Sequence, residues 1–193
     1  MGNAKYIIGA GMVAAFLLWK GAEKAKIMPN PEPDRIDADW VRKQATALRG
    51  EFSSGVDVLL VMAMVKAESN FDPAAERKEY SIFNPLSLFK TGDASIGLMQ
   101  LLTSTALDMY NKGYKKFGVP TIEKLKTPPA NIYFGMAFID WLQNRAKRND
   151  RKYSPAIIAE WYNGGYGNSN IMTRAHSAKV MKYYNEYLQL YGR

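Results

Sequence analysis

The 193-residue sequence contains no cysteine and only one histidine, His176. Without cysteine the chain can form no disulfide, no thiolate metal site and no cysteine nucleophile. A single histidine also argues against a histidine-rich metal site and against a Ser-His-Asp triad. These absences remove several common classes of enzyme before any motif is considered.

Acidic residues are in the minority, with 18 Asp and Glu against 26 Lys and Arg, which gives a net charge of +8. The basic residues concentrate in 112–126 and 145–152. Such charge favours anionic partners such as nucleic acid, anionic lipid or a cell envelope. The sequence carries no nucleic-acid recognition motif, so we expect no nucleic-acid partner. The alternative is that a run such as 145–148 is only the solvated end of a helix.

Long apolar runs are also scarce, and the clearest one is residues 6–19, between Lys5 and Lys20. As a helix it would span about 21 Å of a hydrocarbon core of about 30 Å, and flanking lysines can extend its reach. A signal peptide is the alternative, but the sequence after the run lacks a convincing cleavage site. We therefore expect a membrane anchor in 1–27, a proline-rich linker in 28–36 and a folded domain in 37–193.

Hydrophobic periodicity predicts a mostly α domain with little β structure. The expected helices are 39–49, 58–70, 103–112, 130–147, 155–162 and 174–191, and the expected short strands are 80–83 and 86–89. Ser54 with Asp57 suggests a capping box, and Thr103 and Ser154 are expected N-caps. Pro73 is expected to end the second helix.

One predicted helix carries a carboxylate on its apolar face. Glu68 lies three residues after Val65 and seven after Val61, so it shares their face. Burial and the negative end of the helix dipole both raise the pKa of a carboxyl group. An acid that stays protonated near neutral pH suits general acid catalysis. The alternative is a structural Glu that tilts into solvent or pairs with Lys66 or Arg77.

Three further stretches, 95–100, 131–135 and 159–165, combine amides, aromatic rings and glycines. Amides donate and accept hydrogen bonds, and Tyr and Trp offer flat faces with a polar edge. Together they suggest a groove for a neutral, hydroxyl-rich ligand. Taken singly each has a structural interpretation, for example Met99 as core filler and Tyr162 as a satisfied core tyrosine.

The order of these motifs resembles the lysozyme-like lytic transglycosylases of the soluble-transglycosylase (SLT) type. The matching residues are Glu68-Ser69, Gly97-Leu98-Met99-Gln100, Asn131-Ile132 with Gly135, and Tyr162-Asn163 with Gly165. The resemblance covers about residues 40–190 and implies a lysozyme-like fold, mostly α with minimal β.

The resemblance implies cleavage of the β-1,4 bond between N-acetylmuramic acid and N-acetylglucosamine in peptidoglycan, without water, metal or cofactor. Glu68 would protonate the glycosidic oxygen and then accept the proton of the muramoyl C6 hydroxyl, which closes onto C1 as a 1,6-anhydro product. Tyr162 would hydrogen-bond and orient Glu68. The sugar sites would be lined by Ser69, Ser95, Met99, Gln100 and Asn163.

The sequence departs from the family pattern in three places. Glu68 and Gln100 are 32 residues apart, which is longer than usual, and the extra residues fall in 74–94. Met172-Thr173 stands where many members have Glu-Thr, and His176 stands where an aromatic residue is common. We expect these departures to affect substrate contacts rather than the acid.

Two other functions stay open at this point. A lysozyme-type hydrolase would need a second carboxylate to activate water, and Asp72, Asp93 and Glu160 are the candidates. A non-enzymatic, membrane-anchored wall-binding component would need no acid at all. The expected partners are glycan strands, the membrane through the N-terminal helix, and proteins of a virion or envelope machine. The catalytic domain would face the cell wall in the periplasm or travel in a virion.

Overall fold

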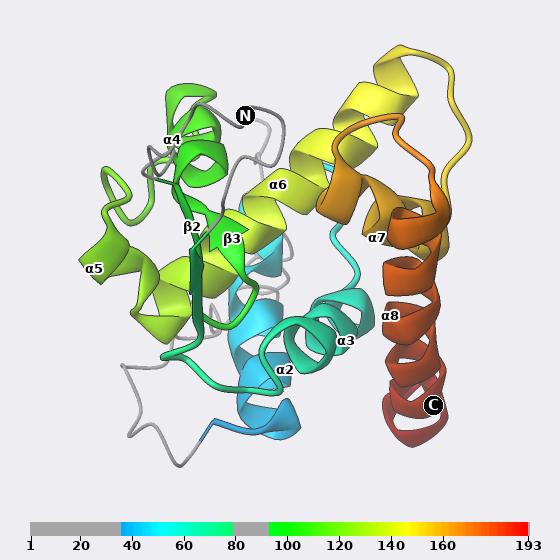
Figure 1. Cartoon of the computed structure of the whole chain (residues 1–193), viewed down its shortest axis with the longest axis horizontal. Coiled ribbons are helices and arrows are strands. Elements are labelled where there is room, and N and C mark those ends of the chain that lie inside the picture. The colour runs from blue at the N-terminus through cyan, green and yellow to red at the C-terminus, as the bar shows by residue number, and fades with distance from the viewer. Residues whose placement is uncertain (1–35, 79–92, 193) are drawn as a thin grey trace, which may run out of the picture.

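The computed structural model describes residues 36–78 and 93–192, and in these ranges the chain is mostly helical (Figure 1). It contains seven α-helices and three short strands. In order, the elements are α2 (Ala38–Leu48), a 3₁₀ turn (Arg49–Glu51), α3 (Val58–Glu68), β1 (Glu76–Lys78), β2 (Ala94–Ile96), β3 (Leu101–Leu102), α4 (Thr103–Asn111), α5 (Ile122–Leu125), α6 (Pro128–Arg148), α7 (Pro155–Gly164) and α8 (Ile171–Tyr191). The expected fold class, mostly α with little β, is confirmed for this part of the chain.

Several predictions lie outside the described residues: the anchor in 1–27, the linker as far as residue 35, and the strands at 80–83 and 86–89. They stay predictions. Among the helices of 36–78 and 93–192, none combines the length and the apolar character needed to cross a membrane.

The helix that carries Glu68 is buried over most of its length and packs against α2 and α8. Its N-cap is Asp57, whose carboxylate accepts from the Leu59 N–H at 2.9 Å and from the Tyr184 hydroxyl at 2.7 Å. The expected capping box with Ser54 is therefore wrong. The Ser54 hydroxyl donates to Gln143 instead, because this loop packs against α6.

Helix α6 runs diagonally through the molecule, with the sheet, α4 and α5 on one side and α7 and α8 on the other (Figure 1). It begins at Pro128, two residues before the predicted start, because proline is well tolerated in the first turn. Most of its first five turns are buried, with Phe138 and Trp141 partly exposed on one side, and its last, basic turn is mostly exposed. The helix is thus the support against which both walls of the site pack.

The other helix starts show where capping predictions hold and fail. Ser154 is the N-cap of α7, as predicted, and accepts from the Ile157 N–H. Thr103 is the first residue of α4 rather than its cap, because the preceding residue already has extended backbone. Helix α8 begins three residues earlier than predicted, since Asn170 and Thr173 form a reciprocal capping box there.

The three strands form an antiparallel sheet in the order β1-β2-β3. Arg77 on β1 pairs with Ser95 on β2, which pairs with Leu102 on β3. Residues directly opposite each other in antiparallel strands project from the same face. This register therefore presents Arg77, Ser95 and Leu102 together, and the turn 97–100 joins the two later strands.

Candidate active site

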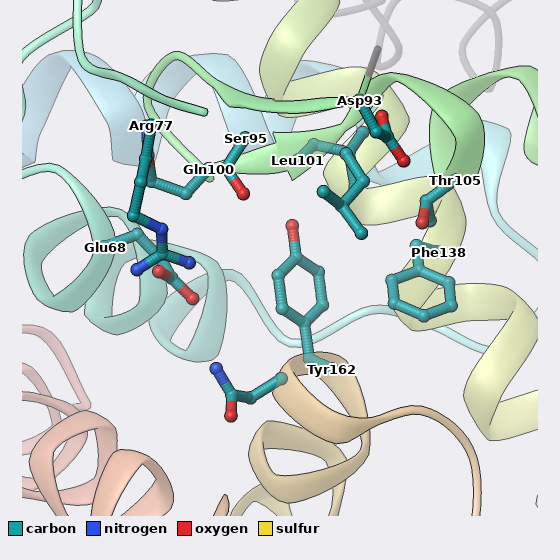
Figure 2. Close-up of a pocket in the computed structure, with 11 residues that line it drawn as sticks. Glu68, Arg77, Asp93, Ser95, Gln100, Leu101, Thr105, Phe138 and Tyr162 are labelled. Atoms are coloured by element: carbon teal, nitrogen blue, oxygen red, sulfur yellow. The ribbon is translucent and has the colours of Figure 1, made fainter. Parts of the chain in front are cut away.

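A cavity of about 420 Å³ opens between the sheet, the end of α3 and helix α7 (Figure 2). Its lining residues are Glu68, Arg77, Asp93, Ser95, Gln100, Leu101, Leu102, Thr105, Phe138, Tyr162 and Asn163. Five of the seven site residues suggested by the sequence are thus brought together at one opening. The two exceptions are Ser69 and Met99.

Glu68 is the last residue of α3, and its side chain is 12% exposed. Burial raises the pKa of this carboxyl group to about 7, against the opposing positive charges of Arg77 and Lys179. The direction agrees with the argument from the apolar helix face. In Figure 2 the Arg77 guanidinium reaches toward the Glu68 carboxylate at the mouth of the cavity. Near neutral pH the site therefore holds an acid that can both give and accept a proton.

His176 on α8 is a titratable neighbour of Glu68, and its Nε2 lies 3.3 Å from Oε1 of Glu68. This nitrogen is buried and has no hydrogen-bond partner among the described residues. Burial, and then the positive charges of Lys179 and Arg77, hold the pKa of His176 below its usual value of 6.5. His176 is thus uncharged at neutral pH, so the contact is not an ion pair there. The sequence marked His176 as unusual but did not place it beside the acid.

Tyr162 rises from α7 with its hydroxyl directed toward the sheet (Figure 2). That hydroxyl donates to the Met99 carbonyl oxygen at 3.0 Å, which corrects the expected hydrogen bond to Glu68. Burial, and then the nearby charge of Glu68, raise the pKa of Tyr162 well above its usual value. Tyr162 therefore lies close enough to Glu68 for the charge of the carboxylate to raise its pKa. Its hydroxyl is hydrogen-bonded to the turn 97–100 rather than to Glu68.

Met99 does not line the cavity, so its predicted place in the sugar sites stays a prediction. Its side chain is fully buried and packs against Gly135 on α6, where a Cβ atom would lie only 2.2 Å from the Met99 sulfur. Gly135 is therefore needed as the space that this side chain fills. Only the backbone of Met99 serves the site, through the carbonyl oxygen that Tyr162 binds.

Ser69 also lies outside the cavity lining, so its predicted role in sugar binding stays a prediction. It follows the last helical residue as the C-cap of α3, and its hydroxyl donates to the Leu98 carbonyl oxygen at 2.8 Å. This bond ties the end of α3, and with it Glu68, to the turn 97–100.

Asn131 on α6 binds the same turn through side-chain hydrogen bonds. Its side-chain oxygen accepts from the Met99 N–H at 2.8 Å, and its amide nitrogen donates to the carbonyl oxygens of Ile96 and Leu125 at 2.8 and 2.9 Å. A Cβ at Gly97, where φ is +71°, would lie 2.6 Å from that amide nitrogen. Only glycine suits this position, because it tolerates both the left-handed backbone and the close approach.

Gln100 lines the cavity, and its side chain is hydrogen-bonded to the backbone of the cavity wall. Its backbone is left-handed, with φ +43°, and its amide nitrogen donates to the carbonyl oxygens of Ala75 and Gly97 at 3.0 Å each. The remaining capacity of the amide oxygen suits the hydroxyls and acetamides of a sugar.

Of the three carboxylates considered for activation of water, only Asp93 lines the cavity. Its carboxylate accepts from the hydroxyl and the N–H of Ser104 in the first turn of α4, and from the Ala94 N–H at 3.2 Å. Asp72 instead accepts from the Ala74 N–H at 2.8 Å in the loop after α3.

The sequence did not assign several residues of this site to the ligand, namely Arg77, Leu101, Leu102, Thr105 and Phe138. Phe138 stacks on Trp141 along the exposed side of α6, a placement that helical spacing alone could have indicated. Within 36–78 and 93–192, no three His, Asp or Glu side chains are grouped as a metal ion would require.

Comparison with known proteins agrees with the motif order. The model of the family described as "Transglycosylase SLT domain" matches residues 48–185. The chain is 34% identical over 115 residues to the endo-type membrane-bound lytic murein transglycosylase A of Klebsiella pneumoniae, covering 57% of this chain and 49% of that protein. It is 35% identical over 142 residues to the membrane-bound lytic murein transglycosylase C of Edwardsiella ictaluri, covering 70% of this chain and 34% of that protein.

The chain thus spans about half the length of the first of these relatives and about a third of the second. The family match, by contrast, extends over most of the chain, from the end of α2 into α8, and includes every residue of the cavity. On this evidence the chain belongs to the transglycosylase SLT domain family.

Proposed function

We propose that this domain is a peptidoglycan lytic transglycosylase that uses Glu68 as its single catalytic acid and base. The observation that carries the proposal is a buried carboxyl group with a pKa near 7 at the mouth of a 420 Å³ cavity. The names of the relatives and the lysozyme-like arrangement of a small sheet beside helices support the same activity.

In this reaction Glu68 donates its proton to the glycosidic oxygen, and the bond from that oxygen to C1 of the muramoyl sugar breaks. The resulting carboxylate then accepts the proton of the C6 hydroxyl as the C6 oxygen bonds to C1. The product is a 1,6-anhydro end, no water is consumed, and Glu68 is protonated again. A pKa near 7 suits both halves of this cycle, because neither proton transfer is strongly uphill.

A lysozyme-type hydrolase is the second candidate, because Asp93 lines the same cavity. Its carboxylate is, however, engaged by Ser104 at the start of α4. A base that activates water needs a free lone pair directed at the water. This engagement favours the transglycosylase, and the product ends distinguish the two reactions.

The test compares Glu68→Gln with Glu160→Gln on purified peptidoglycan, followed by analysis of the released ends. We expect the first change to abolish release and the second to preserve it, because Glu160 does not line the cavity. Anhydro ends support the transglycosylase, whereas reducing ends would make the protein a hydrolase. Full lysis by Glu68→Gln would overturn Glu68 as the catalytic acid, and no release by the unaltered protein would leave a wall-binding component without enzymatic function.

We further propose that residues 1–27 anchor the domain to the membrane with its cavity facing the cell wall. The apolar run 6–19 and the membrane-bound relatives support this. Deleting residues 1–27 should abolish sedimentation with membranes and retain lysis. Retained membrane binding would contradict the anchor. Assembly with a virion or an envelope machine stays a prediction, and co-purification with virions or with envelopes tests it.

A further inference from the structure

A second depression adjoins the cavity that holds Glu68. It has a volume of about 370 Å³ and shares Thr105 and Phe138 with the first cavity. Its other lining residues are Ser104, Asp108, Trp141, Arg145, Gly165 and Tyr166. A polymer lying in the first cavity and passing Phe138 therefore enters the second.

One wall of the depression is aromatic. Phe138 stacks on Trp141 with ring centroids 5.8 Å apart and planes at 19°, and Trp141 meets Tyr166 edge-on at 6.4 Å. All three rings are partly exposed to solvent. Flat aromatic faces of this kind suit the apolar face of a sugar ring, with their polar edges left for hydroxyl groups.

The depression also gathers positive charge. The Arg145 guanidinium lies 5.0 Å from the Trp141 ring centroid and 4.5 Å from that of Tyr166. Lys112 lies 5.6 Å from the Trp141 centroid, and Arg151 lies 5.6 Å from that of Tyr166. The contacts with these two rings restrict the Arg145 side chain, whose guanidinium N–H groups can donate to a ligand.

The opposing negative charge is small. Asp108 is the acidic residue of the depression, and it pairs with Lys112. No carboxylate of the described residues lies within ion-pair distance of Arg145 or Arg151. The depression thus keeps a net positive charge carried by an oriented guanidinium.

We propose that this depression binds a carboxylate of the peptide chains that branch from the glycan, with Arg145 as its main ligand. This inference rests on the proposed function and deepens it. Muramoyl residues carry a lactyl ether from which acidic peptides extend, so a strand in the groove brings carboxylates past Phe138 at regular intervals. A planar guanidinium pairs with a carboxylate through two parallel hydrogen bonds. Trp141 and Tyr166 add the contact with the adjoining sugar.

The test uses two substrates, glycan strands that bear their peptides and the same strands after an amidase has removed them. Arg145→Gln should raise KM about fivefold on the peptide-bearing strands, the upper range for an exposed charge pair, and leave kcat within about twofold. On stripped strands neither constant should change. Lys147→Gln is the matched control, because it removes one charge from an exposed position of the same helix outside the depression.

An equal loss on both substrates, or no loss on either, would overturn the subsite. If the unaltered protein cleaves neither substrate, the proposed activity fails. Binding of the two strands by the Glu68→Gln protein, measured by calorimetry with and without Arg145→Gln, still tests the subsite. Preference for peptide-bearing strands that depends on Arg145 supports it. Displacement of those strands by inorganic phosphate but not by a short acidic peptide would assign the depression to phosphate groups and overturn the peptide assignment.

Discussion

The hydroxyl of Tyr162 donates a hydrogen bond to the carbonyl oxygen of Met99 at 3.0 Å. This bond joins α7 to the turn 97–100, which Ser69 of the α3 C-cap and Asn131 of α6 also hold through side-chain hydrogen bonds. Three helices therefore converge on one short turn between two strands. The position of Glu68 depends on this turn, because Ser69, the next residue after Glu68, is hydrogen-bonded to it.

Tyr162→Phe should lower both stability and turnover. The change leaves the buried Met99 carbonyl oxygen unpaired, which costs about 1–3 kcal/mol of unfolding free energy. Turnover should fall about tenfold, because the turn that positions Gln100 loosens and the substrate is held less well against Glu68. Denaturant unfolding and lysis rates measure the two effects. Unchanged stability would show that the hydroxyl makes no such bond in solution.

Gly135→Ala should destabilise the domain by about 1–3 kcal/mol, because the new methyl group overpacks the core. The added Cβ would lie 2.2 Å from the Met99 sulfur, whose side chain has no exposed surface to move into. Gly50→Ala is the matched control, because no atom lies within 4 Å of a Cβ built there.

A double variant tests the mechanism of this loss. Met99→Ala combined with Gly135→Ala should be less destabilised than the sum of the two single changes, because the smaller side chain makes room for the new methyl group. Strict additivity would show that Gly135 acts through something other than Met99.

His176→Phe should change the acid side of the pH profile of kcat/KM. As the pH falls below the lowered pKa of His176, the imidazole gains a proton, and its charge beside Glu68 makes the Glu68 carboxylate a weaker base for the proton of the C6 hydroxyl. The positive charges of Arg77 and Lys179 face the same pair. We therefore expect activity to fall at low pH in the unaltered protein and to persist in the variant.

The alkaline side of the same profile provides the internal control. Glu68 has a pKa of about 7, so activity should fall above this pH in both proteins as the acid loses its proton. Peptide-free strands are the appropriate substrate, since they carry fewer titrating groups. The same loss at low pH in both proteins would show that His176 does not act on Glu68.

Glu68→Gln should raise stability at alkaline pH while removing activity. The folded protein holds the Glu68 proton more tightly than the unfolded chain, since burial raises its pKa from 4.5 to about 7. Its contribution to stability is therefore full below pH 4.5 and is lost as the pH rises to 7 and beyond. The loss is on the order of 3 kcal/mol, from about 1.4 kcal/mol for each tenfold change in the dissociation constant.

Denaturant unfolding at pH 4, 6 and 8 measures this difference. The curve of the Gln variant should stay flatter than that of the parent between pH 4 and pH 8. Parallel curves would mean that Glu68 titrates at its ordinary value and is not buried in solution.

The sequence by itself determined six of the seven helices described and the nature of the acid, whereas the short helix α5 was not predicted. Both follow from interactions within a few residues, such as the apolar spacing around Glu68, the Ser154 cap and the glycine at the 97–100 turn. The raised pKa of Glu68 could be predicted in direction, because an apolar helix face and a helix end both disfavour a charge. Five residues of the cavity could be named because the order of their motifs resembles that of the SLT family.

Only the tertiary structure decided which side chains face the cavity and which atoms they contact. Met99 turns into the core because Gly135, on another helix, leaves the space for it. Tyr162 binds a carbonyl oxygen rather than Glu68 because α7 packs against the turn. His176 meets Glu68 because α8 packs along α3. No local pattern encodes these contacts, since each depends on how helices far apart in the chain pack against one another.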